Sequence, residues 1–348
     1  MLSVTIDTAV FAPPAIDSTA EEVHRFVTTL LEWKDAMDDD RVDVYTSRFA
    51  PGVLMNCDLY PIRPQLKDLL RRAEVVEYDA NTIAVLAETL LGKSAKIEDA
   101  LGITDVLVED LTIDPDAFSN HAPPDLRQEA ERCAVVISIA SQYCSEPIIQ
   151  GHAIAIRAHD FGSAIRVRGL VQDIDHQRGD LAGLPMAPEY FEGGAFVCSS
   201  LHRLLTGLDE TAVLRVATAE SHVRAAISIA LYKRRVVGGH RTAWQDLPKF
   251  MIGREFVGSL QQHHVSSGSG LAERLMRAVV EAIDHENLAA THALRKGAGP
   301  NDPQRMRGKD AAWRRDVDYE YHLHYWECHA GYVELALLVV HNDFSIPQ

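Results

Sequence analysis

The residue types best suited to chemistry gather in the last forty positions of the chain. Carboxylates and imidazoles recur there at every second position, and a second group follows: Asp316, Asp318, Glu320, His322 and His324, then His341, Asn342 and Asp343. Side chains along a β-strand point alternately to opposite faces, so a strand over residues 318–328 would direct its acids and histidines to one face. Two imidazoles and two carboxylates on one face suit a divalent metal ion or general acid–base chemistry.

The aromatic content of residues 318–328 favours a strand, because aromatic and β-branched side chains are enriched in strands. A helix over residues 310–328 is the alternative, and there His322 and His324 would diverge by about 200° and could not share a metal ion. On the strand interpretation, His322 and His324 are the predicted ligands of a divalent metal. The predicted catalytic residues are His322, His324, Glu320 and Asp318.

The tripeptide His322-Leu323-His324 resembles the histidine–hydrophobic–histidine metal motif of the HUH endonucleases. The resemblance implies cleavage of single-stranded DNA by a tyrosine nucleophile, and it covers three residues of 348. Only 24 residues follow His324, which leaves no room for a downstream tyrosine helix. An upstream tyrosine would be needed, and no feature of the sequence selects one.

A loop rich in serine and glycine precedes a strongly apolar segment. Its predicted ligand-binding residues are Ser266, Ser267, Gly268, Ser269 and Gly270. A loop of this kind at the start of a helix over residues 271–285 presents backbone N–H groups, hydroxyls and the positive end of the helix dipole, which together bind phosphate or carboxylate. The alternative is a flexible linker in which Ser269 serves only as the helix N-cap.

Basic side chains cluster between this loop and the histidines. Seven fall within 21 residues: Arg295, Lys296, Arg305, Arg307, Lys309, Arg314 and Arg315. Trp313 lies among them and offers a surface on which a base can stack. We therefore predict that Arg274, Arg314 and Arg315 hold the phosphates of a small ligand or of single-stranded nucleic acid. The alternative is a solvated loop that is rich in arginine.

The composition is that of a globular protein, with 348 residues, 47% hydrophobic and 24% charged. Apolar runs such as residues 335–340 are too short to cross a bilayer, and residues 1–11 contain Asp7 but no basic residue, unlike a secretory signal. The five cysteines include no CxxC pair, which argues against a disulfide framework or a thiolate zinc site. We therefore expect a reduced, cytoplasmic protein without a membrane partner. An excess of 26 arginines over 8 lysines suggests a bacterial origin.

The formal charge of −16 is unevenly distributed. Residues 1–130 contain 25 acids and 11 bases, whereas residues 131–348 contain 25 acids and 23 bases. Because phosphate binding requires a basic surface, the acidic part argues against duplex-DNA binding through that part of the chain. It permits docking onto a basic partner protein, although solubility alone would explain the same charge.

Periodicity predicts an α+β fold: a helical N-terminal region followed by a mixed α+β domain with antiparallel hairpins. We expect an acidic helical domain over residues 1–114, a proline-rich linker at 115–125 and an α+β domain over 126–348. The predicted helices cover residues 21–37, 65–74, 80–91, 96–101, 126–143, 220–235 and 271–285. Two hairpins are predicted, one from residues 152–158 and 164–174 and one from 318–328 and 332–341, with a long loop at 176–194.

Three functions remain open on the sequence alone. The first is an accessory subunit of a nucleic-acid-related complex in a defence or mobile-element system, docked through its acidic region. The second is a metal-dependent enzyme that processes phosphodiesters or nucleotides with the histidine and acid face. The third is a small-molecule metabolic enzyme.

Overall fold

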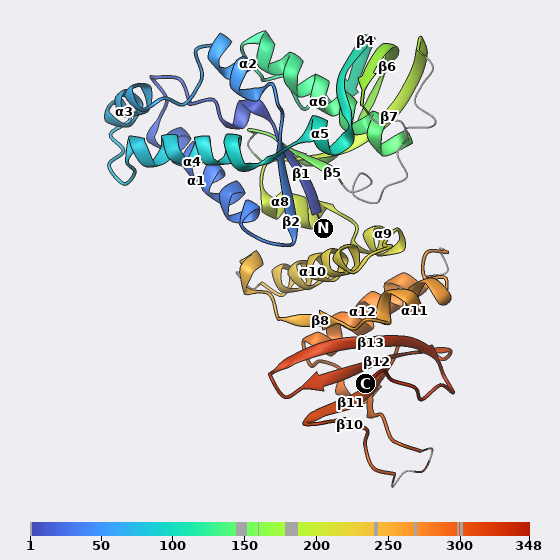
Figure 1. Ribbon diagram of the computed structural model, residues 1–348. Helices are drawn as coiled ribbons and strands as arrows, with labels where there is room; N and C mark the ends of the chain where they lie inside the picture. Colours follow the sequence, from blue (N-terminus) through green and yellow to red (C-terminus); the bar gives the residue numbers. More distant parts are fainter. Residues whose placement is uncertain are drawn as a thin grey trace. The chain divides into compact units, whose positions relative to one another are not determined.

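The computed structural model describes residues 2–143, 152–158, 160–177, 187–239, 243–267, 270–297, 299 and 302–348. It divides into two compact units, which we call the N-terminal unit (Met1–Gly207) and the C-terminal unit (Leu208–Gln348). Each unit combines helices with a β-sheet, which confirms the predicted α+β class (Figure 1). Among the described residues, no helix has both the length and the apolar character that a membrane span requires.

The N-terminal unit contains a seven-stranded sheet in the order β3-β2-β1-β5-β7-β6-β4. Its strands are β1 (Leu2–Ile6), β2 (Val42–Thr46), β3 (Ala95–Lys96), β4 (Ile103–Asp114), β5 (His152–Ala155), β6 (Gly162–His176) and β7 (Glu189–Cys198). Its helices are η1 (Thr8–Val10), α1 (Ala20–Met37), α2 (Ala50–Asn56), α3 (Arg63–Arg72), α4 (Ala80–Lys93), α5 (Ile97–Leu101), α6 (Pro124–Tyr143) and α8 (Leu201–Gly207).

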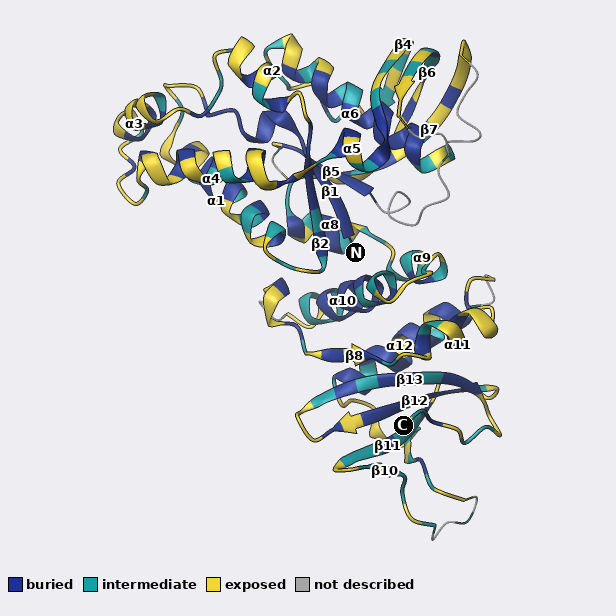
Figure 2. Ribbon diagram, in the orientation of Figure 1, coloured by how far each residue is buried: buried dark blue, intermediate teal, exposed yellow. Residues whose placement is uncertain are grey.

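Parallel strands form the centre of this sheet. Strand β1 pairs in parallel with β2 on one side and with β5 on the other, and β5 pairs in parallel with β7. Both β1 and β5 are buried along their whole length, which is typical of a parallel sheet covered on both faces (Figure 2). The predicted helical N-terminal region therefore also contains strands, β1 to β4, before residue 115. Strand β1 gives no alternating pattern because both of its faces are buried.

The predicted hairpin of residues 152–158 and 164–174 does not form. Strand β7 lies between β5 and β6 and pairs with both, in parallel with β5 and antiparallel to β6. The loop predicted at residues 176–194 ends earlier than expected, because β7 begins at Glu189. Residues 178–186 of that loop lie outside the described residues. Glu189 and Tyr190 are exposed, so the start of β7 resembles a loop in sequence.

The helices of this unit agree better with the predictions. Helix α1 begins at a capping box in which Thr19 and Glu22 exchange hydrogen bonds. Its inner side buries an apolar stripe that includes Leu30 and Trp33, and each fully buried side chain of this size contributes about 1.5–3 kcal/mol. One predicted end is wrong: Gly92 lies inside α4 instead of closing it.

The division between the units falls after Gly207, whereas the sequence places a linker at residues 115–125. Strand β4 precedes residues 115–125 and α6 follows them, and both pack into the same sheet of the N-terminal unit. Phe118, within that segment, is fully buried in the same core cluster. Prolines in this segment mark a turn between two packed elements and not a domain boundary.

The C-terminal unit has a six-stranded sheet in which β9 pairs with β11 beside the order β10-β11-β12-β13-β8. Its strands are β8 (Phe250–Ile252), β9 (Thr291–Ala293), β10 (Met306–Arg307), β11 (Asp310–Asp316), β12 (Tyr321–Cys328) and β13 (Tyr332–Val340). Its helices are α9 (Glu210–Arg215), α10 (Glu220–Val237), η2 (Trp244–Asp246), α11 (Phe256–Gln262), α12 (Leu271–Ile283) and η3 (Leu288–Ala290).

The predicted C-terminal hairpin is confirmed: β12 and β13 pair antiparallel across the turn at residues 329–331. Helix α12 packs against β11, β12 and β13 on one face of the sheet. The chain after β13, residues 341–348, folds back over the other face, and we call it the tail. Ile346 of the tail is buried there with Trp326 and Ala312, so the two faces of this sheet have different covers.

Candidate functional site

The strand interpretation of the histidine segment is correct for residues 321–328, but not for the acids that precede them. His322 and His324 lie on β12, whereas Asp318 and Glu320 lie in the bend that leads into it. Glu320 is exposed, and Asp318 accepts hydrogen bonds from the backbone N–H groups of Glu320 and Tyr321 at 2.8 Å each. Asp318 therefore shapes the turn, and the predicted four-residue face is reduced to the two histidines.

His322 and His324 share the face that the tail covers, and both are essentially buried, with exposed fractions of 1% and 0%. Nε2 of His322 lies 3.1 Å from Asp316 Oδ1, and its ring lies 4.6 Å from that of His341. Burial lowers the pKa of His322, although the Asp316 carboxylate acts in the opposite direction. We therefore expect a neutral His322 near pH 7, with its Nε2 proton directed at Asp316.

His324 is held by the tail. Its Nδ1 lies 2.7 Å from the Ser345 carbonyl oxygen, so Nδ1 carries the proton and donates it. Burial lowers the pKa of His324 to about 4, with the Ser345 carbonyl opposing this change. Two residues further along β12, Trp326 Nε1 donates to the Pro347 carbonyl at 3.1 Å. Two side chains of one strand thus fix the tail in place.

Each of the two histidines keeps one ring nitrogen without a partner. His322 Nδ1 and His324 Nε2 are buried and receive no hydrogen bond in the structure. Metal-binding histidines commonly have this arrangement, with one nitrogen donating to a carboxylate or carbonyl and the other free to ligate. Across the described part of the chain, however, no three or more His, Cys, Asp or Glu side chains are arranged to hold a metal ion.

Arg314 and Arg315 are neighbours on β11 with opposite surroundings. Arg315 is 1% exposed, forms an ion pair with Glu281 of α12, and donates to the carbonyl of Glu286 at 2.9 Å. Its position and partners tie β11 to the end of α12. Arg314 points to the other face, directly opposite His324 in the strand register, and its guanidinium carbon lies 5.8 Å from the centre of the Phe344 ring.

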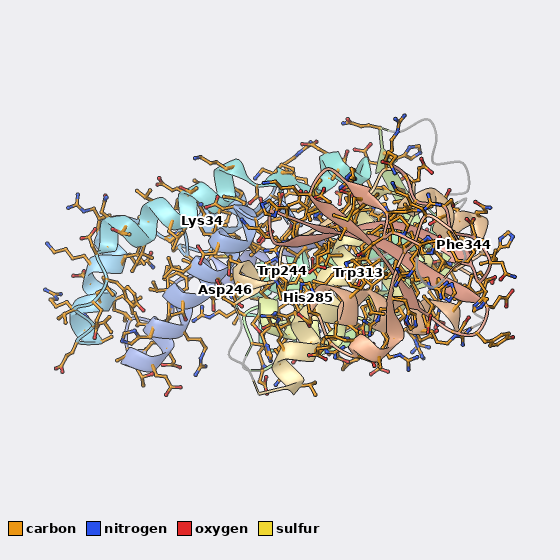
Figure 3. The ribbon with its side chains drawn as sticks, turned by 90° about the horizontal axis from the view of Figure 1, so that it is seen from below. Lys34, Trp244, Asp246, His285, Trp313 and Phe344 are labelled. Carbon is orange, nitrogen blue, oxygen red and sulfur yellow. The ribbon has the colours of Figure 1, made fainter. Side chains whose placement is uncertain are left out.

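A polar pocket of about 500 Å³ opens beside Arg314. Phe344, which is labelled in Figure 3, belongs to its wall. Its wall comes from β9, the following turn, β11 and the tail: Thr291, His292, Ala293, Leu294, Arg295, Gly297, Gly299, Arg314 and Phe344. We call it the β9–β11 pocket. Two guanidinium groups, those of Arg295 and Arg314, line this pocket, and no salt bridge to a described residue is formed by either of them. Arg295 Nη1 donates to the Asp302 carbonyl at 2.6 Å, and the Asp302 carboxylate accepts from the Gly299 N–H at the pocket edge.

A carboxylate joins the pocket to the buried histidines. Asp316 Oδ2 lies 3.6 Å from Nε2 of His292, and its other oxygen faces His322. His292 is about half exposed on the pocket wall, with 46% of its side chain accessible. A histidine that lies beside a carboxylate and opens to a pocket is a candidate general acid or base.

The Ser/Gly loop lies apart from these groups in the contacts that the structure describes. Ser266 and Ser267 are exposed, Ser267 donates to the His264 carbonyl at 2.7 Å, and Gly268 and Ser269 lie outside the described residues. The N-cap of α12 is Gly270, in the left-handed conformation with φ of 71°. Arg274 donates to Asp318 at 2.9 Å, so its charge is balanced within the protein.

His292 and Phe344 were not among the residues predicted from the sequence. Arg295 was predicted only as one member of the cluster of seven basic residues. An extension of the α12 pattern to residue 294 is plausible in sequence, and it hides the short strand β9 that carries His292. One signal was available: Asn287, which precedes η3, adopts the left-handed conformation with φ of 49°, and asparagine is among the residues that accept this conformation, so a helix continuous through residue 294 is disfavoured. Phe344 gives no such signal, because its role depends on the folding back of the tail.

Comparison of the chain with protein-family models, curated proteins and solved structures gives no match. The arguments for function therefore rest on the residues of this chain.

Proposed function

We propose that the C-terminal unit binds a phosphate-bearing ligand of about nucleotide size in the β9–β11 pocket. The observation that carries this proposal is the pair Arg295 and Arg314, two unpaired guanidinium groups on the wall of one polar pocket. Arginine matches the geometry of phosphate with two parallel N–H donors. The volume of about 500 Å³ lies within the range of about 300–1,000 Å³ that small-molecule sites occupy.

Phe344 gives the pocket an apolar side on which a ring can rest. Its ring already lies under the Arg314 guanidinium, so a nucleobase or another flat group would find an aromatic and a cationic surface together. A phosphorylated metabolite and the end of a single strand of nucleic acid share this chemistry.

Isothermal titration calorimetry with three probes, AMP, ATP and a ten-residue oligothymidylate, tests the proposal. The Arg314→Ala variant should lose at least tenfold in affinity, since a charge-assisted pair contributes about 1.5–3 kcal/mol. Arg254→Ala is the matched control, because Arg254 is an exposed arginine of the same unit outside the pocket. Equal affinities for wild type and Arg314→Ala, or no binding of any probe, would overturn the proposal.

We further propose His292 as the acid–base group that acts on the bound phosphate ester, because Asp316 orients it at the pocket wall. Hydrolysis of bis(p-nitrophenyl) phosphate provides a direct assay of phosphodiester cleavage. His292→Gln should abolish turnover and leave AMP affinity within about twofold, whereas turnover that persists in His292→Gln contradicts this role.

A metal ion on His322 and His324 stays a prediction, and the two unpartnered ring nitrogens favour it. In an enzyme that processes phosphodiesters, a divalent ion there would stabilise charge on the phosphate. Elemental analysis by mass spectrometry of protein purified without chelator tests the prediction. Near-stoichiometric metal that disappears in the His322→Ala/His324→Ala variant supports it, and a metal content that does not depend on these residues refutes it.

The accessory-subunit hypothesis stays a proposal for the N-terminal unit. That unit contains 33 acidic and 17 basic residues, a net charge of −16, which favours a basic partner protein. Affinity capture from the host at two salt concentrations tests it. A basic partner that is retained at low salt and released at high salt supports docking through charge. An unchanged set of captured proteins after partial reversal of this charge counts against it.

A further inference from the structure

A second pocket lies at the carboxyl edge of the parallel strands in the N-terminal unit. It has a volume of about 180 Å³ and is lined by Val10, Glu22, Arg25, Phe26, Thr29, Ile156, Arg157, Ala158 and Ser199. Val10 follows β1, residues 156–158 follow β5, Ser199 follows β7, and the other four residues belong to α1. We call it the carboxyl-edge pocket.

The topology of the sheet explains why a pocket forms here. After β1 the chain crosses through α1 to β2 on one side, whereas after β5 it continues to the strands on the other side. Adjacent parallel strands whose connections leave in opposite directions open a crevice at their carboxyl ends, and ligands of open α/β sheets bind in such crevices. Strands β1 and β5 are neighbours in this sheet, and residues from just after both of them line the pocket.

Arg157 supplies the charge of the carboxyl-edge pocket. Its Nη1 donates to the Ala12 carbonyl at 2.7 Å, and it forms no ion pair with a described residue. Arg157 as a whole is exposed, but desolvation of its charged end lowers its pKa, with Glu22 opposing this change and Arg25 adding to it. A guanidinium has five N–H donors, so Arg157 retains donors for a ligand.

The other charged groups of the pocket already have partners. Arg25 pairs with Glu21 at 2.8 Å, outside the pocket lining, and Glu22 accepts from the backbone N–H of Thr19 at 2.8 Å. The Ser199 hydroxyl accepts from Phe161 N at 2.9 Å. Glu22 and Arg157 interact electrostatically, so Glu22 offsets part of the positive charge, but the pocket wall holds two arginines against this one carboxylate.

We propose that the carboxyl-edge pocket binds a small oxyanion, a phosphate or carboxylate group, through the guanidinium of Arg157. The volume corresponds to about six water molecules at about 30 Å³ each, which accommodates such a group but not a nucleotide. This site is separate from the β9–β11 pocket in sequence and in ligand size, and its existence does not depend on the function proposed for the C-terminal unit.

Calorimetric titration with inorganic phosphate, pyrophosphate and malonate tests the proposal, and all proteins carry Arg314→Ala so that the β9–β11 pocket does not contribute. Binding should saturate at one site per chain, and the stronger of the phosphate and malonate responses identifies the preferred group. Arg157→Gln should reduce affinity at least tenfold, whereas Arg63→Gln, at an exposed arginine outside the pocket, should leave it unchanged.

Because Arg157 also holds the Ala12 carbonyl, a second variant separates binding from folding. Ala158→Leu fills the pocket without removing Arg157 and should block the anion, while the melting temperature without ligand stays near that of the parent. Arg157→Lys, which keeps the charge, should restore part of the affinity. The proposal fails if Arg157→Gln and Ala158→Leu bind anions as the parent does, or if none of the three anions binds the parent.

Discussion

The N-terminal unit has 33 acidic and 17 basic residues, whereas the C-terminal unit has 17 of each. Their sheets differ as well: the centre of the first is parallel and buried on both faces, and the second is largely antiparallel, with a helix on one face and the tail on the other. Both units nevertheless contain unpaired arginines at pockets. If both proposals hold, the local position of a cation on its sheet, and not the net charge of the unit, determines where an anion binds.

The same comparison applies within one strand. Arg314 and Arg315 are adjacent, and the alternation of the strand sends one to the pocket and the other to a buried ion pair. Arg132 of the N-terminal unit is also held in ion pairs, like Arg315. It pairs with both Glu98 and Glu129, and its side chain is only 13% exposed. Arg315 and Arg132 are thus held by carboxylates within the protein, whereas the proposals assign Arg295, Arg314 and Arg157 to ligands.

The largest expected effect comes from breaking these buried pairs. Arg132→Ala should lower the free energy of unfolding by about 3–5 kcal/mol, because the Glu98 and Glu129 carboxylates are left buried without their cation. Arg315→Ala should lower it by less, since Glu281 is 14% exposed and keeps a hydrogen bond from Asn287. Arg314→Ala should change it by about 0.5 kcal/mol, because the half-buried Arg314 forms no ion pair with a described residue. Chemical denaturation of the three variants measures this difference. Similar losses for Arg314→Ala and Arg315→Ala would remove the distinction between pocket and structural arginines.

An intermediate effect is expected on acidification, because each unit buries a neutral histidine. The pKa of His324 falls from 6.5 to about 4 and that of His152 falls to about 3, in both cases through burial. The unfolded chain therefore binds protons more tightly than the folded one, and stability is fully present above pH 6.5 and declines as the pH falls toward 4. For His324 this amounts to about 3 kcal/mol.

Denaturation curves between pH 4 and pH 8 measure this dependence. His324→Gln cannot titrate, so its stability should change less over this range than that of the wild type. A pH dependence in His324→Gln as steep as in the wild type would show that His324 does not carry the effect.

The smallest expected effect on stability comes from the N-terminal caps of α1 and α12, one helix from each unit. Helix α1 has the Thr19 capping box, whereas α12 begins at Gly270 without a side-chain cap. Thr19→Ala should cost about 1 kcal/mol, typical of the loss of an N-cap hydrogen bond. The melting temperature measures it, and Thr28→Ala, on the exposed face of the same helix, is the control. A larger loss in Thr28→Ala would contradict the assignment of the cap.

The elements that the sequence predicts well are those whose pattern is local. Helix α1 has its cap and its stripe, and the β12–β13 hairpin has its alternation and a short turn. Strand β1 is missed because both of its faces are buried, and β5 is assigned the wrong neighbour because β7, which separates it from β6, comes later in the chain. Pairing between distant segments leaves no trace in local periodicity.

The candidate site was predictable to the same extent. The strand and the shared face of His322 and His324 follow from alternation, but their burial does not, since it depends on the tail that covers them. The different roles of Arg314 and Arg315 follow only from knowing which face α12 covers. The carboxyl-edge pocket could not be anticipated, because it brings together residues more than 100 positions apart, such as Val10 and Arg157.

The hydrogen bond from Trp326 to the Pro347 carbonyl has a practical consequence for observing the protein in solution. The indole of Trp326 is fully buried, and the same tail carries Phe344 into the wall of the β9–β11 pocket. A change that detaches the tail would admit water to the indole, which shifts tryptophan emission to longer wavelengths. The emission wavelength of Trp326 therefore reports whether the tail is in place over the sheet.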